Sequence, residues 1–294
     1  TNQDGTATHA GPDDGGDVPA WLAFQAEKRE AAQQGSSVEP VASGTSTACR
    51  ELWDVADVAP AVSSVESMGD WCGPWPVLAG DARILVRKAV AKTVGFLEKD
   101  MGEYIAFDYH TCSAGMLPDM FPDPLALARK SEARLLAAVR RECRGLLLCS
   151  STGLVLARRL PKFFNVDEVE ETRLSNLPAE GGLATVKMDG SLVSPFLLNS
   201  SLRWAGKAAI IPELEAFMAA CPPLARLAEA LVRRGCTPIF EWCAAGSPVG
   251  VIAHQESRIV LLAVRGMVSG QFWPQERLQA LGCEVAGSVS FDGL

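Results

Sequence analysis

The stretch Lys187-Met188-Asp189-Gly190-Ser191 decides how this chain is interpreted. An apolar run, Gly182 to Val186, precedes it, and Leu192-Val193 follows it. This order predicts a buried strand that ends at a lysine, a tight turn at Asp189-Gly190 and a second strand, together a hairpin. Because glycine lets a ligand approach the backbone closely, we expect the amine of Lys187 to project into a cleft.

A lysine in such a place is a candidate nucleophile. Its amine attacks electrophiles when desolvation or nearby positive charge keeps it neutral. Lys187 is therefore the candidate catalytic residue. A Lys-x-Asp-Gly turn also occurs in ordinary hairpins, so the functional interpretation depends on the residues around it.

Composition and charge bound the classes of protein to consider. The chain has 294 residues, 48% of them hydrophobic and 21% charged, as in soluble globular proteins. Its net charge of −8 excludes a wholly basic nucleic-acid binder but is compatible with a local basic groove. No apolar run approaches the roughly 20 residues of a membrane helix. No signal peptide is visible, so we expect no membrane partner and an intracellular location, cytoplasmic or nuclear.

The cysteines and histidines give no metal-binding pattern. Nine cysteines lack CxxC spacing, which predicts free thiols in a reducing compartment. The three histidines, His9, His110 and His254, are too dispersed for a metal site, and His254 lies in a strand-like run. The sequence identifies no metal ligands.

The chain divides into two parts by composition. Residues 1–48 are rich in Gly, Asp, Ser, Thr and Ala, which predicts a disordered low-complexity tail. Residues 49–294 are expected to form the folded domain. Within it, apolar periodicity predicts a helix between Ile84 and Leu97, and two helices within Pro212–Arg234 that are separated by Pro222-Pro223. Short apolar runs predict strands at 104–109, 146–149, 154–157, 238–243, 249–253 and 258–265.

Four motifs follow one another along this domain. They are Glu142-Cys143-Arg144-Gly145, Pro161-Lys162-Phe163-Phe164-Asn165, the Lys187 motif, and Phe240-Glu241-Trp242 with the strand that begins at Arg258. This order resembles the phage-type RNA ligase 1 family, ATP-dependent RNA ligases of the covalent nucleotidyltransferase superfamily, over about residues 104–281. The Lys-Phe-Phe-Asn stretch combined with Lys-x-Asp-Gly-Ser-Leu makes the resemblance fairly specific.

The resemblance implies both a fold and an activity. The fold would be α+β, an ATP-grasp-like nucleotidyltransferase (ligase adenylation) domain with antiparallel sheets flanked by helices. Lys187 would attack the α-phosphate of ATP, with Mg²⁺, to form lysyl-AMP. AMP would then pass to an RNA 5′-phosphate, and a 3′-hydroxyl would displace it, as in RNA repair of the tRNA type.

The resemblance also assigns roles to single residues. Arg144 and Lys162 would contact the phosphates or sugar, Asp189 and Gly190 would position the nucleotide, and Glu241 would bind the ribose hydroxyls. Arg258 matches a family position that is basic. RNA would approach a basic groove that is formed by Arg144, Arg158, Arg159, Lys162, Arg203 and Lys207.

The chain departs from the family in ways that leave alternatives open. Ala205 stands where the family has a lysine, and residues 248–251 lack its arginine. Residues 285–294 do not match the later Glu-Gly and Lys-x-Lys motifs, so we expect an adenylation domain that is incomplete at its carboxy end. A DNA ligase, a capping-type nucleotidyltransferase and a catalytically inactive nucleotide- or RNA-binding relative remain as alternatives.

Overall fold

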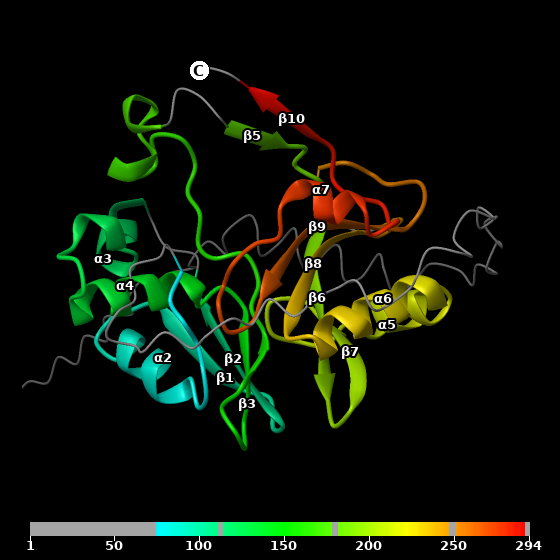
Figure 1. The fold of residues 1–294 in the computed structure, drawn as a ribbon, viewed down its shortest axis with the longest axis horizontal. Coiled ribbons are helices and arrows are strands. Elements are labelled where there is room, and N and C mark those ends of the chain that lie inside the picture. Colours follow the sequence, from blue (N-terminus) through cyan, green and yellow to red (C-terminus); the bar gives the residue numbers. More distant parts are fainter. Residues whose placement is uncertain (1–74, 111–113, 178–181, 247–250, 292–294) are drawn as a thin grey trace, which may run out of the picture. The chain divides into compact units, whose positions relative to one another are not determined.

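The computed structural model describes residues 75–110, 114–177, 182–246 and 251–291 (Figure 1). All of them belong to one compact unit, Thr47–Leu294. The predicted tail, residues 1–48, lies outside the described residues, and so do residues 249 and 250 of the predicted strand 249–253.

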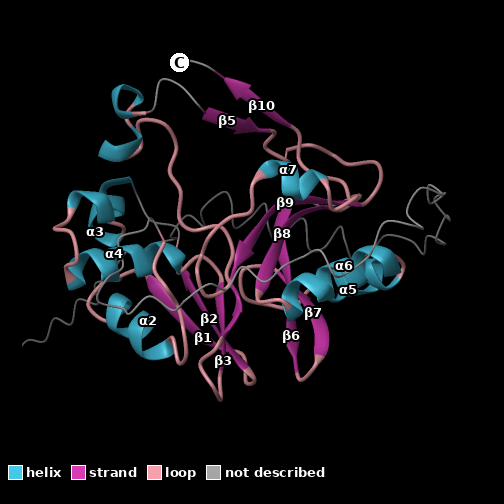
Figure 2. Ribbon diagram, viewed as in Figure 1, coloured by secondary structure: helices cyan, strands magenta, loops and turns pink. Residues whose placement is uncertain are grey.

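Short helices and strands alternate along the described residues (Figure 2). The α-helices are α2 (Arg83–Val90), α3 (Leu117–Met120), α4 (Glu132–Glu142), α5 (Pro212–Ala219), α6 (Pro222–Arg233) and α7 (Gln275–Gln279). The strands are β1 (Phe96–Asp100), β2 (Tyr104–Tyr109), β3 (Leu146–Cys149), β4 (Val155–Ala157), β5 (Gly182–Thr185), β6 (Ser191–Leu198), β7 (Ser201–Ala205), β8 (Cys236–Cys243), β9 (Arg258–Gly266) and β10 (Ser288–Phe291). Four 3₁₀ turns lie at Ala114–Met116, Pro124–Ala126, Glu170–Thr172 and Leu174–Asn176.

The strands form two four-stranded sheets and one pair. The first sheet has the order β1-β2-β3-β4, the second has the order β7-β6-β8-β9, and β5 pairs with β10. Every pairing between these strands is antiparallel. The predicted α+β class with antiparallel sheets flanked by helices is thus confirmed.

Three hydrophobic clusters stack the helices and sheets into layers. Side chains of α2 and α4, such as Val86 and Val139, pack on one face of the first sheet. Its other face meets the second sheet, where Tyr104 packs with Phe196. Helices α5, α6 and α7 cover the far face of the second sheet, around Phe240. Burial of these apolar faces is the main force that holds the layers together.

Local sequence signals explain where several helices begin and end. Ser131 caps α4, because its Oγ accepts a hydrogen bond from the Arg134 amide at 3.2 Å. Pro222 begins a new helix, so the predicted break between α5 and α6 is confirmed. Gly235 follows α6 with a φ of +73°, a conformation that glycine adopts without strain. The helix predicted between Ile84 and Leu97 is shorter: α2 ends at Val90, and Phe96 already begins β1.

The predicted hairpin at the lysine turn is wrong. β5 pairs with β10, about 100 positions later in the chain, whereas β6 pairs with β7 and β8. The apolar run that suggested a buried strand is largely exposed, with Leu183 52% and Val186 57% accessible. The turn therefore connects two different sheets. His254 and residues 251–253 are not in a strand either.

Within the described residues, no helix is both long enough and apolar enough to span a membrane.

A buried ion cluster joins the first sheet's helix α4 to the second sheet. Glu142, the last residue of α4, lies between Arg158, just after β4, and Arg265 on β9. Each guanidinium donates two hydrogen bonds to its carboxylate, at 2.8–3.0 Å. Burial opposes ionisation of Glu142, but the two cations outweigh it and lower the pKa of Glu142 to about 2. The three side chains, hereafter the Glu142 cluster, are all charged in the folded protein.

Removing the acid of the Glu142 cluster should destabilise the fold strongly. Glu142→Ala leaves two buried guanidinium charges without a counter-ion, which costs about 3–5 kcal/mol of unfolding free energy. Glu98→Ala is the matched control, because its pair with Arg87 is exposed and is worth about 0–1 kcal/mol. Urea unfolding of both variants measures the difference. Similar, small losses in the two would contradict a structural role for the Glu142 cluster.

The same carboxylate should make stability depend on pH in the acid range. The folded-state pKa of Glu142 lies below the ordinary 4.5, so its contribution is complete above pH 4.5 and is lost as the pH falls toward 2. We expect the unfolding free energy to decline over this window and to decline less in Glu142→Gln. Parallel pH profiles for the two proteins, measured by urea unfolding, would show that Glu142 is not the group responsible.

Candidate functional site

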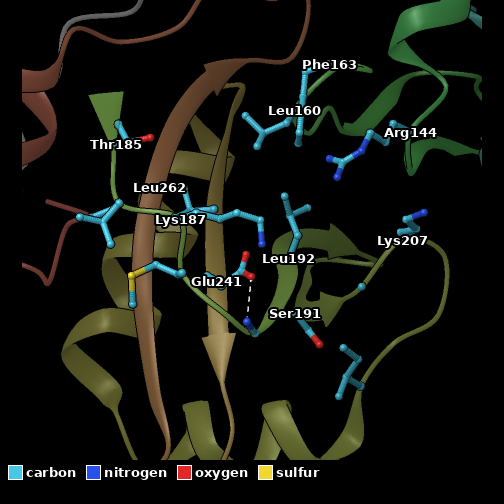
Figure 3. Close-up of a pocket in the computed structure, with 16 residues that line it drawn as sticks. Arg144, Leu160, Phe163, Thr185, Lys187, Ser191, Leu192, Lys207, Glu241 and Leu262 are labelled. Carbon is cyan, nitrogen blue, oxygen red and sulfur yellow. Dashed lines mark hydrogen bonds between the residues drawn. The ribbon is translucent and has the colours of Figure 1, made fainter. Parts of the chain in front are cut away.

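A cavity of about 710 Å³ lies between the lysine turn, the second four-stranded sheet and the segments just before β3 and after β4 (Figure 3). Its charged lining consists of Lys187, Arg144, Lys207 and Glu241. Apolar side chains complete the wall, and the hydroxyl-bearing residues Thr185 and Ser191 also line it. A cavity of this size suits a ligand as large as a nucleotide.

Lys187 reaches this cavity from the segment between β5 and β6. In Figure 3 its side chain extends toward Glu241 and Leu192 rather than away from the cavity. Leu192 pairs with Glu241 across β6 and β8, which places the end of the turn beside that acid. The predicted lysine in a cleft is therefore present, although the turn is built differently from a hairpin.

Glu241 closes the turn and faces the same cavity. Its carboxylate accepts a hydrogen bond from the Gly190 amide at 3.1 Å. Burial raises the pKa of Glu241, while this hydrogen bond and the charge of Lys187 oppose the shift. Its neighbours on β8, Phe240 and Trp242, point to the opposite face of the strand, so the side-chain alternation that the sequence predicted places Glu241 in the cavity.

Arg144 supplies a cation on the other side of the cavity. It follows α4 by two residues, and its guanidinium lies over the Phe163 ring at 4.7 Å from the centroid. Its Nη1 is buried and has no hydrogen-bond partner among the described residues. A buried, unpaired donor is costly, and a hydrogen bond from this atom to an anion would remove that cost.

Lys207 lies on the same side of the cavity as Arg144 (Figure 3). Its ammonium is 3.9 Å from the Asp108 carboxylate and 5.4 Å from the centre of the Tyr109 ring. Arg203, predicted with Lys207 to bind RNA, is instead paired with Glu215 at 2.7 Å and does not line the cavity.

Three predicted nucleotide-binding residues lie outside the cavity lining. The Asp189 carboxylate accepts hydrogen bonds from the Ile252 and Val251 amides, which lower the pKa of Asp189. Lys162 lies 4.4 Å from the centre of the Phe164 ring and donates to the Phe163 carbonyl at 2.8 Å. Arg258 pairs with Glu284 at 3.3 Å on the surface. In this structure Asp189 stabilises a loop rather than contacting the cavity.

The prediction that Arg158 and Arg159 contact RNA is wrong. Both side chains are buried, with 0% and 2% of their surface accessible. Arg158 binds Glu142, and Arg159 donates to backbone carbonyls. Burial lowers the pKa of Arg159 to about 10. Two adjacent arginines in the sequence suggested a surface patch. Both are buried because Glu142 and the backbone carbonyls of other segments pair with them.

Sequence reasoning missed several residues of the cavity. Leu160, Leu192, Ile211 and Leu262 form much of its apolar wall. Leu192 lies on β6 and follows the two-residue alternation, so its side could have been predicted once the register was known. Leu262 lies at a break in the β8–β9 register, which the sequence does not mark. No local sequence pattern predicts the contact between Asp108 and Lys207, because the two residues are about 100 positions apart.

The described residues contain no group of three or more His, Cys, Asp or Glu side chains that would hold a metal ion. Around the cavity they instead present three cations and one carboxylate. Such a set binds an anion through the cations and hydroxyl groups through the carboxylate. A primary amine at its centre can act as a nucleophile toward an electrophile held by the cations.

Gly190 is needed because the turn is packed tightly against β8. A Cβ at this position would lie 2.5 Å from the Trp242 carbonyl oxygen, so the backbone would have to shift. We expect Gly190→Ala to lower the unfolding free energy by about 1–3 kcal/mol and to displace Lys187. Gly115→Ala is the control, because its Cβ meets nothing within 4 Å. Equal thermal midpoints for the two variants would contradict the close contact.

Comparison with known proteins finds similarity to RNA ligases over just under half of the chain. Residues 142–282 match the sequence profile of a family described as RNA ligase. A protein of Thermovibrio ammonificans, named as a candidate RNA ligase, is 28% identical over 142 residues. That alignment covers 47% of this chain and 37% of the relative, so the chain spans well under half of that relative's length.

A solved structure of an archaeal ATP-dependent RNA ligase also aligns with this chain. The TM-score is 0.43 at 14% identity, over 69% of this chain and 50% of that one. The predicted resemblance to RNA ligases is confirmed by the family match, which includes Arg144, Lys187 and Glu241. Over residues 142–282, just under half of its length, the chain is therefore similar to the RNA ligase family.

Proposed function

We propose that this chain carries the adenylation site of an ATP-dependent RNA ligase, with Lys187 as the nucleophile. The observation that carries the proposal is the meeting of Lys187, Arg144 and Glu241 in one cavity, from three separate parts of the chain. The match to the RNA ligase family supports RNA as the substrate.

The proposed first step is attack of the neutral Lys187 amine on the α-phosphate of ATP. A nitrogen–phosphorus bond forms, the bond to the β-phosphate oxygen breaks, and pyrophosphate leaves while the amine gives up a proton. Arg144 lies where it can neutralise charge on the phosphate oxygens, which is the main catalytic contribution in phosphoryl transfer. Glu241, which lines the same cavity, would accept hydrogen bonds from the ribose hydroxyls.

The remaining two steps would use RNA ends. A 5′-phosphate oxygen of RNA attacks the α-phosphate of lysyl-AMP, which breaks the nitrogen–phosphorus bond and restores the lysine. A 3′-hydroxyl oxygen then attacks the activated 5′-phosphate and AMP leaves, so the net product is a phosphodiester. A role in RNA repair, of the tRNA type, would follow from this chemistry.

Mg²⁺ would accompany the nucleotide rather than occupy a site built by protein acids alone. Glu241 is the one carboxylate of the cavity among the described residues, and Mg²⁺ commonly binds through one or two carboxylates and the substrate phosphates. The ion would neutralise phosphate charge.

Labelling with ATP tests the proposal directly. The natural full-length polypeptide, incubated with ATP labelled at the α-phosphate and Mg²⁺, should become covalently labelled, and its intact mass should rise by one AMP. Lys187→Ala should abolish the label, because Lys187 is the amine that extends toward Glu241 in the cavity (Figure 3). Lys99→Ala is the control, since Lys99 is exposed on the edge strand β1, and it should label like the parent protein.

The same assay separates this proposal from its alternatives. Labelling by GTP in place of ATP would indicate a capping-type enzyme, and sealing of nicked DNA in preference to RNA would indicate a DNA ligase. If ATP binds to the full-length protein but no AMP is added, the chain belongs to an inactive binding relative and the proposed chemistry is refuted.

A further inference from the structure

A buried arginine lies behind the side of the cavity that carries Arg144 and Lys207. The Arg159 guanidinium donates hydrogen bonds to the carbonyl oxygens of Gly145 and Lys207, the latter at 3.3 Å, and to that of Ala205 at 3.2 Å. Gly145 follows Arg144 directly. One planar, buried group thus fixes the spacing between the two backbone segments that carry the cavity's outer cations.

Asp108, on strand β2, lies close to Lys207, which is on one of these two segments. It is 95% buried, and its Oδ1 lies 3.9 Å from the Lys207 ammonium. The same oxygen has no hydrogen-bond partner among the described residues. A buried carboxylate is costly unless a cation lies near it, so Asp108 favours conformations that keep Lys207 close. The adjacent ring of Tyr109 adds a second attraction for the ammonium.

We propose that Asp108 is a positioning residue, which holds the Lys207 ammonium at the edge of the cavity so that Lys207 and Arg144 bind one phosphate group of the substrate. The inference rests on the proposed function and extends it to a residue outside the segment that matches the RNA ligase family. The phosphate is either part of the ATP polyphosphate or the 5′-phosphate of RNA.

The charge balance favours this role over simple neutralisation of Lys207. Asp108 is one acidic side chain, whereas Arg144, Arg159 and Lys207 bring three basic side chains to this side of the cavity. A net positive charge therefore remains for a phosphate. Lys207 is 53% exposed, so without an anchor its flexible side chain would lose more entropy on binding. Asp108, on strand β2, restricts the position of the Lys207 ammonium before the ligand binds.

A double-mutant cycle tests whether Asp108 acts through Lys207. Asp108→Asn, Lys207→Ala and the double variant are prepared in the natural full-length polypeptide, and inorganic pyrophosphate binding is measured by calorimetry. We expect Lys207→Ala to weaken binding about tenfold and Asp108→Asn about fivefold. In the Lys207→Ala background, Asp108→Asn should have almost no further effect. Thermal unfolding of each variant separates lost positioning from lost folding.

A surface pair provides the matched control. Arg233 is as exposed as Lys207, at 53%, and pairs with Glu229 one helical turn away on α6. Glu229→Gln and Arg233→Ala should leave pyrophosphate binding unchanged. Weakening by these variants equal to that of Asp108→Asn and Lys207→Ala would mean that general charge, not positioning, governs binding, and would overturn the proposal.

Kinetic measurements identify the source of the phosphate. If the group belongs to ATP, Asp108→Asn raises the KM for ATP in lysyl-AMP formation about fivefold and leaves kcat nearly unchanged. If it belongs to RNA, the KM for 5′-phosphorylated RNA rises instead, in the transfer of AMP. Independent, additive effects of the two substitutions on pyrophosphate binding, or no effect of either, would overturn the positioning role. A parent protein that binds pyrophosphate but never takes up AMP would refute only the proposed function.

Discussion

The fold depends on the ion pairs that Glu142 makes with Arg158 and Arg265. All three side chains are inaccessible to solvent, so each charge must find its partner inside the protein. The three residues come from the end of α4, the segment after β4 and strand β9. These ion pairs therefore form only when both four-stranded sheets have docked. They also fix the position of the backbone next to Arg144, which lines the cavity.

The Glu142 cluster also sets the position of a residue that lines the cavity. Arg144 lies two residues after Glu142, and its amide donates to the Glu142 carbonyl at 2.7 Å, so the guanidinium starts from a fixed backbone. On the far side, the Arg265 guanidinium contacts both rings of the Trp75–Phe272 pair, at 4.9 and 4.8 Å from their centroids. A buried ion cluster contributes little net stability compared with apolar packing, but only one arrangement of these layers satisfies it. Its main effect here is to specify geometry.

The sequence predicts local chemistry in this chain better than it predicts pairing over long distances. The Pro222 break and the strand at Glu241 follow from rules about neighbouring residues. The partner of β5 is a strand about 100 positions away, and no local signal identifies it. The predictions that Val186 is buried and Arg158 exposed fail for the same reason. Hydrophobicity gives only an average preference for burial, and residues distant in the sequence decide whether each side chain is buried.

Whether a cationic side chain already has a partner in the protein, more than its position in the sequence, distinguishes structural cations from those available to a ligand. Arg203 and Arg258 are each paired with a glutamate, and Arg159 is held by carbonyl oxygens. Arg144, by contrast, keeps a buried nitrogen without an acceptor among the described residues, and it lines the same cavity as Lys187. The chain as a whole is acidic, at −8, so an anionic ligand is not drawn by its net charge. The attraction for an anionic ligand arises locally in the cavity. There, burial strengthens the electric field of cations that are not neutralised by acidic side chains.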